Sequence, residues 1–283
     1  MKVDGKMRVC AVIGDPVEHS LSPLLHNAAF AEKGLDICYV AFRVEDLAAA
    51  MVGVRALNLL GLSVTIPHKV AILPHLDQVE ETAKKIGSVN TVLRKHESLI
   101  GFNSDGMGAL RALREAGAEL TGKKIAILGS GGAARAIAFT LGKEAALEEM
   151  ILLGIDTREC RSLWEDLRKT VSFPVQWEPL SPESLKRQIP ASDGVIHCTP
   201  IGMSPQTEAS LLDEQLLRPE QFVFDIVYTP LRTRLLKQAE SVGCRTIPGV
   251  EMFLHQAVFQ FELWTGTEAP VDCMRKVVME SLA

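Results

Sequence analysis

The stretch KKIAILGSGGAARAIAFTL, residues 123–141, decides the fold of this chain. It opens with an apolar run at residues 124–128 that is typical of a short buried strand. Gly129, Gly131 and Ala134 follow at G-x-G-x-x-A spacing, and the pattern then becomes helical. The first glycine permits a tight turn, the second lets backbone approach a pyrophosphate, and the third small residue lets helix and strand pack closely.

The loop between this strand and helix is therefore expected to bind a dinucleotide. Its backbone N–H groups and the dipole of the following helix would face the anion. A glycine trio alone is a weak signal, but the strand before it and the helix after it favour this interpretation. The alternative is a tight turn that binds no ligand.

Strands and helices alternate on both sides of this unit. Strands are expected at residues 7–13, 36–44, 62–66, 89–93, 99–102, 124–128, 150–153, 195–198 and 222–227. Helices are expected at residues 46–57, 77–86, 107–116 and 133–141, from Ser22 as N-cap towards Gly34, and again from Met252. Such alternation is typical of α/β proteins with mainly parallel sheets.

We therefore predict an α/β protein of two domains. The first, residues 1–108, is expected to be a substrate-binding domain with a mixed, mainly parallel sheet. The second, residues 109–251, is expected to be a Rossmann-like dinucleotide-binding domain. The last segment, residues 252–283, is expected to return to the first domain.

The composition is that of a soluble globular protein, with 283 residues, 47% hydrophobic, 23% charged and a net charge of −5. No basic run suggests a nucleic-acid partner, and no apolar run approaches the roughly 20 residues of a membrane helix. The first residues lack a signal core, and the six cysteines form no C-x-x-C pair, so we expect reduced thiols and a cytoplasmic location. The histidines show no H-E-x-x-H pattern, so no metal site is predicted. A monomer or a homodimer is expected.

Polar side chains follow four expected strands of the first domain. They are His19, Ser20 and Ser22; Thr65, His68 and Lys69; Asn90 and Thr91; and Asn103, Ser104 and Asp105. Because ligands of open α/β sheets bind beyond the carboxyl ends of the strands, we expect these side chains to converge. Hydroxyls and amides suit a small polyhydroxylated acid, and Lys69 with Asp105 suits a proton-transfer pair.

Each of these residues has a purely structural alternative. Ser22 is equally well explained as a helix cap, and Asp105 can cap the helix expected from Met107. Asn90 can be a turn residue. Lys69 can be a solvated helix charge, which is the usual place of lysine.

The residues after the second strand of the dinucleotide domain bear on the choice of nucleotide. Asp156 there favours NAD, because a carboxylate accepts bonds from a ribose 2′-hydroxyl. Arg158 favours NADP, because a guanidinium pairs with a 2′-phosphate. The alternative for both is a solvated loop charge.

Seven motifs, in this order, resemble those of the shikimate dehydrogenase family over essentially the whole chain. They are IGDPVEHSLSP (13–23), VTIPHK (64–69), GSVNT (87–91), GFNSDG (101–106), GSGGAAR (129–135), FDIVYTP (224–230) and MFLHQAVFQFELWTG (252–266). The resemblance implies an oxidoreductase that reversibly reduces 3-dehydroshikimate to shikimate with NADP, a step of aromatic amino-acid (chorismate) biosynthesis.

The resemblance also implies roles for individual residues. Lys69 and Asp105 are implied to be catalytic. The implied substrate contacts are Ser20, Ser22, Thr65, Asn90, Tyr228 and Gln256. The implied cofactor contacts are Gly129, Ser130, Gly131, Gly132 and Ala133, with Ile226 and Gly249 near the nicotinamide.

The chain departs from the family pattern at several positions. The family usually has asparagine at Ser63 and His197, and phenylalanine at His68. Its N-R-T clamp for the 2′-phosphate aligns with residues 154–156, Gly-Ile-Asp, so the clamp arginine is missing. We rank NADP ahead of NAD and expect weak discrimination between them. The alternatives are an NAD-dependent quinate/shikimate dehydrogenase, a paralogue acting on an amino analogue of shikimate, and a non-catalytic nucleotide sensor.

Overall fold

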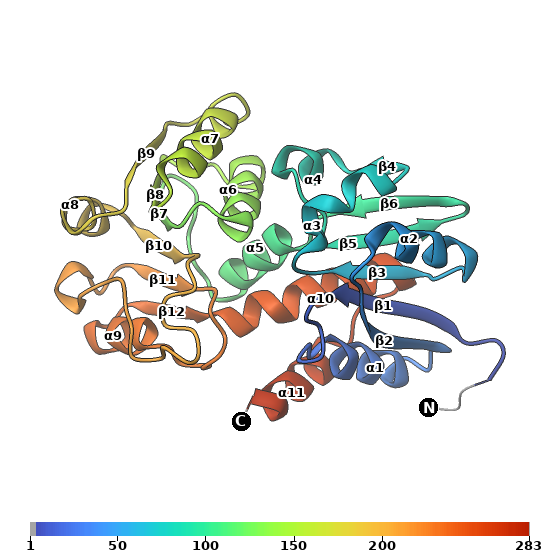
Figure 1. Ribbon diagram of the computed structural model, residues 1–283. Coiled ribbons are helices and arrows are strands. Elements are labelled where there is room, and N and C mark those ends of the chain that lie inside the picture. Colours follow the sequence, from blue (N-terminus) through green and yellow to red (C-terminus); the bar gives the residue numbers. More distant parts are fainter. Residues whose placement is uncertain (1–3, 283) are drawn as a thin grey trace. The chain divides into compact units, whose positions relative to one another are not determined.

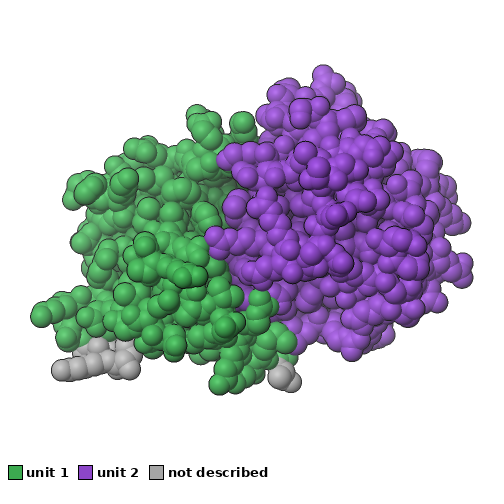
Figure 2. Space-filling model, turned by 180° about the vertical axis from the view of Figure 1, so that it is seen from behind, with its two compact units in different colours: residues 1–104, 256–283 green, residues 105–255 purple. Residues whose placement is uncertain are grey.

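The computed structural model describes residues 4–282. Its contacts divide the chain into two compact units. Unit 1 comprises the chain up to residue 104 together with the chain from residue 256, and unit 2 comprises residues 105–255 (Figure 2). The two borders lie a few residues from the expected positions, and Asp105 is therefore the first residue of unit 2.

Unit 1 is built on a six-stranded mixed sheet in the order β2-β1-β3-β5-β6-β4 (Figure 1). The strands are β1 (Arg8–Gly14), β2 (Ile37–Arg43), β3 (Gly61–Val64), β4 (Gln78–Val79), β5 (Thr91–Lys95) and β6 (Ser98–Phe102). β1 pairs in parallel with both β2 and β3, and β4 with β6, whereas β5 runs antiparallel to β3 and β6. The carboxyl ends of β1 and β3 consequently lie side by side.

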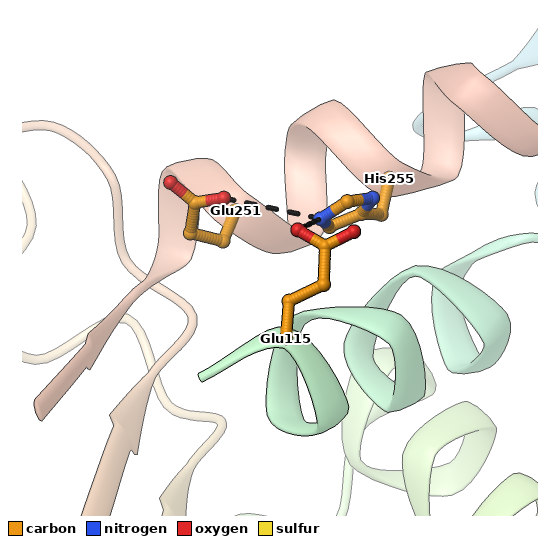
Figure 3. A group of neighbouring side chains, drawn as sticks. All are labelled: Glu115, Glu251 and His255. Carbon is orange, nitrogen blue, oxygen red and sulfur yellow. Dashed lines mark ion pairs between the residues drawn. The ribbon is translucent and has the colours of Figure 1, made fainter. Parts of the chain in front are cut away.

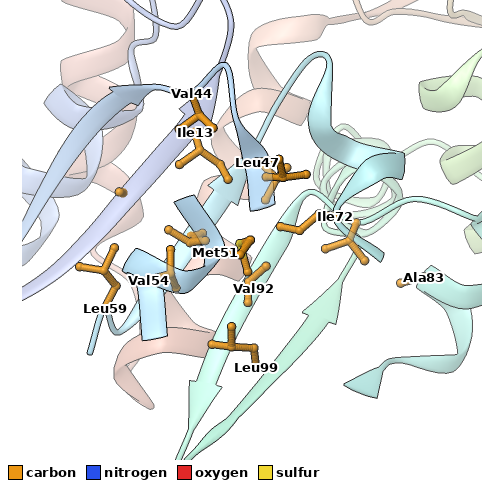
Figure 4. Close-up of a cluster of buried hydrophobic side chains, with 14 residues drawn as sticks. Ile13, Val44, Leu47, Met51, Val54, Leu59, Ile72, Ala83, Val92 and Leu99 are labelled. Atoms are coloured by element: carbon orange, nitrogen blue, oxygen red, sulfur yellow. The ribbon is translucent and has the colours of Figure 1, made fainter. Parts of the chain in front are cut away.

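The helices of unit 1 cover both faces of this sheet. They are α1 (Ser22–Glu32), α2 (Leu47–Ala56), α3 (His68–Ala71), the 3-10 turn η1 (Leu73–His75), α4 (Glu81–Ile86) and α11 (Val271–Leu282). Residues of α2 such as Met51 and Val54 pack on Leu62 and Val92 of the sheet, as Figure 4 shows in part. A further helix, α10 (Gly249–Thr265), begins in unit 2 and ends in unit 1.

Unit 2 is built on a six-stranded sheet in the order β9-β8-β7-β10-β11-β12. The strands are β7 (Lys124–Leu128), β8 (Glu149–Gly154), β9 (Val175–Pro179), β10 (Gly194–His197), β11 (Phe222–Asp225) and β12 (Arg245–Pro248). Every pair is parallel. The chain turns from one side of β7 to the other between β9 and β10, so the loop after β7 lies where ligands of doubly wound sheets bind.

The helices of unit 2 lie on both faces of its sheet (Figure 1). They are α5 (Asp105–Glu115), α6 (Gly132–Glu144), α7 (Thr157–Leu167), α8 (Pro182–Ala191), the 3-10 turn η2 (Glu214–Leu216) and α9 (Arg234–Val242). Successive residues of its central strands are buried, because a parallel sheet is covered on both sides. Two α/β units, one with a Rossmann-like sheet, confirm the predicted fold class.

No helix among residues 4–282 is long and apolar enough to cross a membrane.

Two predicted elements of unit 1 were wrong in extent. The strand expected at residues 62–66 ends at Val64, because Ile66 is 70% exposed and only Gly61–Val64 pair within the sheet. The helix expected from residue 77 begins at Glu81. Residues 78–79 instead pair with β6, and the Glu80 carboxylate caps the helix by accepting the Thr82 and Ala83 N–H groups.

Candidate active site

The cofactor loop leaves the carboxyl end of β7. Gly129 has a φ of +113°, and a Cβ there would lie 3.1 Å from the Cys198 carbonyl oxygen, so the turn requires glycine. Gly131 is the N-cap of α6, and among the described residues no side chain caps this helix. A Cβ on Gly131 or Gly132 would meet no atom within 4 Å, so space lies in front of the first-turn N–H groups. This arrangement fits the pyrophosphate of a dinucleotide.

The neighbouring loop, after β8, carries Asp156 and Arg158. The Oδ1 atom of Asp156 accepts the N–H groups of Arg158 (2.9 Å) and Glu159 (3.0 Å), so Asp156 is the N-cap of α7. The Ser130 hydroxyl donates to the Glu159 carboxylate at 3.0 Å, which joins the two loops. Ile155, at the position of the family's clamp arginine, is 69% exposed. The predicted ribose contact of Asp156 therefore has to be made by the carboxylate that also caps α7.

The two residues expected near the nicotinamide lie together. A Cβ on Gly249 would stand 2.3 Å from the Ile226 carbonyl oxygen, so only glycine permits this approach of the two backbone segments. Tyr228, two residues after Ile226, stacks its ring on Phe253 of α10 with a centroid distance of 5.3 Å. The loop after β11 and the first turns of α10 thus form one part of the site in unit 2.

His197 is a buried residue whose hydrogen bonds stabilise this part of the site. Its Nδ1 lies 2.8 Å from the Asp225 Oδ1 atom, and its Nε2 lies 2.5 Å from the Thr199 hydroxyl. The second Asp225 oxygen accepts from the Thr233 hydroxyl at 2.6 Å, and its first accepts the Val227 N–H. His197 and Asp225 are at most 1% exposed. His197 therefore holds the ends of β10 and β11 together.

In unit 1, the predicted substrate residues gather beyond the carboxyl ends of β1 and β3. A Cβ on Gly14 would lie 2.3 Å from the Thr65 methyl carbon, so the end of β1 is shaped to receive this side chain. Ser20 lies in the loop after β1, and its hydroxyl accepts the Ser22 N–H at 3.3 Å. Lys69 is half-buried in the short helix α3.

Asn90 is buried beside the start of β5, so it is not an exposed turn residue. Its Oδ1 atom accepts the Thr91 hydroxyl (2.8 Å) and the Ser104 N–H (2.8 Å). The Ser104 hydroxyl reaches the Gln256 Oε1 atom at 3.3 Å. The structure therefore brings two predicted substrate residues, Asn90 and Gln256, to one serine hydroxyl.

Two sequence interpretations near this site need correction. Ser22 is buried and does not cap α1: the N-cap is Leu21, and within the described chain no side chain caps that end. Asp105 does not precede its helix as a cap, because α5 begins at Asp105 itself.

His68, the histidine next to the predicted catalytic lysine, is buried and bonds through Nε2 to the Val44 carbonyl oxygen at 2.7 Å. It therefore anchors α3.

A histidine and two acids join α5 to α10. Figure 3 shows Glu251 and His255, on successive turns of α10, facing Glu115 at the end of α5. The Nε2 atom of His255 lies 3.0 Å from Glu115 and 3.9 Å from Glu251. These atoms are close enough to hold a metal ion, although no histidine was predicted to be a ligand. The contact between Glu115 and His255 joins α5 to the helix that carries Gly249 and Gln256.

Sequence reasoning missed three buried side chains, His26, Tyr39 and Gln260. They bond with one another or with the buried hydroxyls of Ser63, Thr91 and Ser104. Gln260 lies in the apolar run AVFQFELW, and a lone amide in such a run is the signal that could have revealed it.

His26 makes the stability of the fold depend on pH. Burial lowers its pKa from 6.5 to about 3, against a smaller opposing effect of its bond to Gln260. Below pH 6.5 the unfolded chain binds this proton and the folded chain does not. We expect the free energy of unfolding to fall as the pH falls from about 6.5 to about 3. The free energy of unfolding, measured by denaturant titration at several pH values, should change less steeply with pH for His26→Gln than for wild type. The exposed control His19→Gln should have the wild-type slope of this free energy against pH. Equal slopes for wild type and His26→Gln would contradict this.

The comparisons with known proteins agree with this geometry. The substrate binding domain of shikimate dehydrogenase matches residues 12–92, and the shikimate 5′-dehydrogenase C-terminal domain matches residues 249–279. A shikimate dehydrogenase (NADP(+)) from Moorella thermoacetica is 43% identical over 285 residues, covering 100% of this chain and 96% of that protein.

Two solved structures have the same fold over nearly the whole chain. Shikimate 5-dehydrogenase from Listeria monocytogenes, in complex with shikimate and NAD, has a TM-score of 0.94 and 37% identity, with 98% of each chain covered. Quinate dehydrogenase from Corynebacterium glutamicum, in complex with NAD, has a TM-score of 0.90 and 30% identity, covering 97% of this chain and 99% of that chain. The family expected from the seven motifs is confirmed, and this chain belongs to the shikimate dehydrogenase family.

Proposed function

We propose that this chain is an NADP-linked shikimate dehydrogenase that interconverts 3-dehydroshikimate and shikimate. The observation that carries the proposal is the 43% identity, over the full length, to an enzyme named for that activity. The site fits it, because unit 1 groups hydroxyls and amides suited to a polyhydroxylated acid and unit 2 holds a loop suited to a dinucleotide. The relatives named as NADP(+) enzymes agree with ranking NADP ahead of NAD.

Gly129 to Ala133 would hold the pyrophosphate, and Ile226 and Gly249 would border the nicotinamide. The reduced cofactor supplies a hydride to the 3-keto carbon of the substrate. As the carbonyl electron pair moves onto oxygen, the Lys69 ammonium donates a proton to that oxygen, and the neutral amine is reprotonated from solvent. We propose that the Asp105 carboxylate orients the lysine and a substrate hydroxyl. In the oxidising direction, Lys69 accepts the proton.

The substrate carboxylate and ring hydroxyls are assigned to the remaining polar side chains. They are Ser20, Ser22, Thr65, Asn90, Tyr228 and Gln256. Six free cysteines agree with a reducing compartment, and we place the enzyme in the cytoplasm.

A matrix of two substrates and two cofactors tests the proposed function. We expect the highest kcat/KM with shikimate and NADP⁺, and lower values with quinate or NAD⁺. A higher kcat/KM for quinate with NAD⁺ would identify the chain as a quinate dehydrogenase. No reduced cofactor with either substrate would favour the nucleotide sensor.

The loop after β8 is expected to weaken the preference for NADP. The exposed Asp156 carboxylate repels a 2′-phosphate, and Asn can replace it as a cap without the charge. We expect Asp156→Asn to raise the NADP-to-NAD ratio of kcat/KM about fivefold, and Arg158→Ala to lower it. Ile155→Arg, which restores the clamp arginine, should raise the NADP-to-NAD ratio of kcat/KM further than Asp156→Asn. Glu165→Gln, an exposed acid on the same helix, serves as the control. Ratios that stay equal in all four variants would show that these side chains do not reach the ribose.

A further inference from the structure

We propose that Gln260 is a positioning residue that holds the substrate-contacting side chains Asn90 and Ser22 in one arrangement. This proposal rests on the proposed function, which assigns Asn90 and Ser22 to the substrate. Gln260 itself touches neither of them. It acts through two short chains of hydrogen bonds that meet at its side-chain amide.

The first chain leads to Asn90. The Gln260 Nε2 atom donates to the Thr91 hydroxyl at 2.9 Å, and that hydroxyl donates to the Asn90 Oδ1 atom at 2.8 Å. Gln260 and Thr91 are at most 1% exposed, and Asn90 is 3% exposed. Together with the Ser104 N–H, which donates to the same oxygen at 2.8 Å, the Thr91 hydroxyl fixes the orientation of the Asn90 amide plane.

The second chain leads to Ser22. The Gln260 Oε1 atom accepts the Ser63 hydroxyl at 3.0 Å, and the Ser63 oxygen accepts the Tyr39 hydroxyl at 2.6 Å. Burial raises the pKa of Tyr39, and a smaller opposing effect of Ser22 places that serine side chain next to the Tyr39 hydroxyl. One amide in α10 therefore connects α1, β2, β3 and β5, the elements that carry or border the substrate residues.

His26 fixes which way the Gln260 amide faces. Burial lowers the pKa of His26 to about 3, so its imidazole is neutral at physiological pH. Its Nε2 lies 3.3 Å from Gln260 Oε1, and its ring stacks on Tyr39 with centroids 4.6 Å apart. Among the described residues, Nδ1 has no hydrogen-bond partner, so the ring proton belongs on Nε2 and donates to the amide oxygen. This leaves the amide nitrogen directed at Thr91.

Position 63 carries a serine, so the side-chain amide of this hydrogen-bond network is supplied by Gln260 on α10. Ser63 and Thr91 are paired across β3 and β5, and the Gln260 amide bonds both of their hydroxyls. An asparagine at position 63, the residue usual in the family, would place an amide on β3 itself. Loss of the Gln260 amide leaves buried hydroxyls without partners, and such groups find new partners by moving. The expected consequence is a misplaced Asn90 amide and weaker substrate binding.

Steady-state kinetics of Gln260→Leu tests this role. We expect the KM for shikimate to rise about tenfold, while the KM for NADP⁺ stays within about twofold of the wild-type value. Gln221→Leu is the matched control, because Gln221 is a fully buried amide in unit 2 that bonds the Ile189 and Ser192 carbonyls. It should lower thermal stability and leave the KM for shikimate unchanged.

A second variant keeps the test decisive if Gln260→Leu folds poorly. Thr91→Val removes only the relaying hydroxyl and preserves its shape. It should raise the KM for shikimate to a similar extent, and the Thr91→Val/Gln260→Leu double variant should add little. Thr91→Val with wild-type KM would overturn the proposal, as would Gln260→Leu that loses stability without a change in this KM.

A readout without substrate separates this proposal from the proposed function. The side-chain amide resonance of Asn90 in ¹⁵N-labelled protein should shift or broaden in Gln260→Leu and stay in place in Gln221→Leu. If wild type fails to oxidise shikimate but Asn90 responds in this way, the function is wrong and the positioning role holds. An unmoved Asn90 resonance would refute the positioning role.

Discussion

Replacement of Lys69 by methionine is expected to lower kcat by about 10²- to 10⁴-fold while leaving thermal unfolding unchanged. Methionine keeps most of the apolar stem of this half-buried side chain and removes the ammonium that gives a proton to the substrate oxygen. The fold should tolerate the change, because His68 anchors α3 through the Val44 carbonyl.

Rapid measurement of reduced cofactor with saturating shikimate gives kcat directly. Lys84→Met, an exposed lysine on α4 of the same unit, is the matched control and should retain wild-type kcat. A Lys69→Met enzyme with kcat near that of Lys84→Met would remove Lys69 from the proton transfer.

Asp105→Asn is expected to lower kcat by about 10²-fold with little change in stability. Asp105 is the first residue of α5, where a carboxylate stabilises the helix dipole by only about 0.3–1 kcal/mol, so the fold is retained while the charge is lost. Asp46→Asn makes the same change at the N-cap of α2, whose carboxylate accepts the Ala49 N–H, and should have wild-type kcat.

Because Lys69 and Asp105 are proposed to act as one unit, their effects should not add. The Lys69→Met/Asp105→Asn double variant should be no more than a few fold slower than Lys69→Met alone. A double variant slowed by the full product of the two single effects would show that Asp105 acts by a separate route.

Elements whose signals lie within a few residues could be predicted from the sequence. The strand–glycine–helix unit around Gly129 is such a case, because strand, turn and helix each carry their own local pattern. β4 is the opposite case: Gln78–Val79 form a strand only because Ile100 and Gly101 lie beside them. Helix α7 was not predicted although Cys160, Leu163 and Leu167, its buried residues, have helical spacing.

The residues of the candidate site also fall into those that a local sequence pattern predicts and those that depend on partners distant in sequence. The position of Thr65 could be predicted because an α/β sheet directs residues after its strands to one edge. Asn90 lies at the same edge because β5 runs antiparallel to β3 and begins there. What these residues bond to could not be predicted. Ser22 was interpreted as a cap or a substrate contact and does not cap α1, and Asp156, interpreted as a ribose ligand, also caps α7. Partners that are distant in sequence decide such roles, and Gln260 was overlooked for the same reason.

The transfer of deuterium from labelled NADPH tests the central claim most directly. We expect 3-dehydroshikimate and NADPH deuterated at the transferable position of the nicotinamide to give shikimate with one deuterium on C3, as detected by NMR and mass spectrometry. Shikimate without deuterium on C3, or no shikimate at all from the folded wild-type protein, would contradict it.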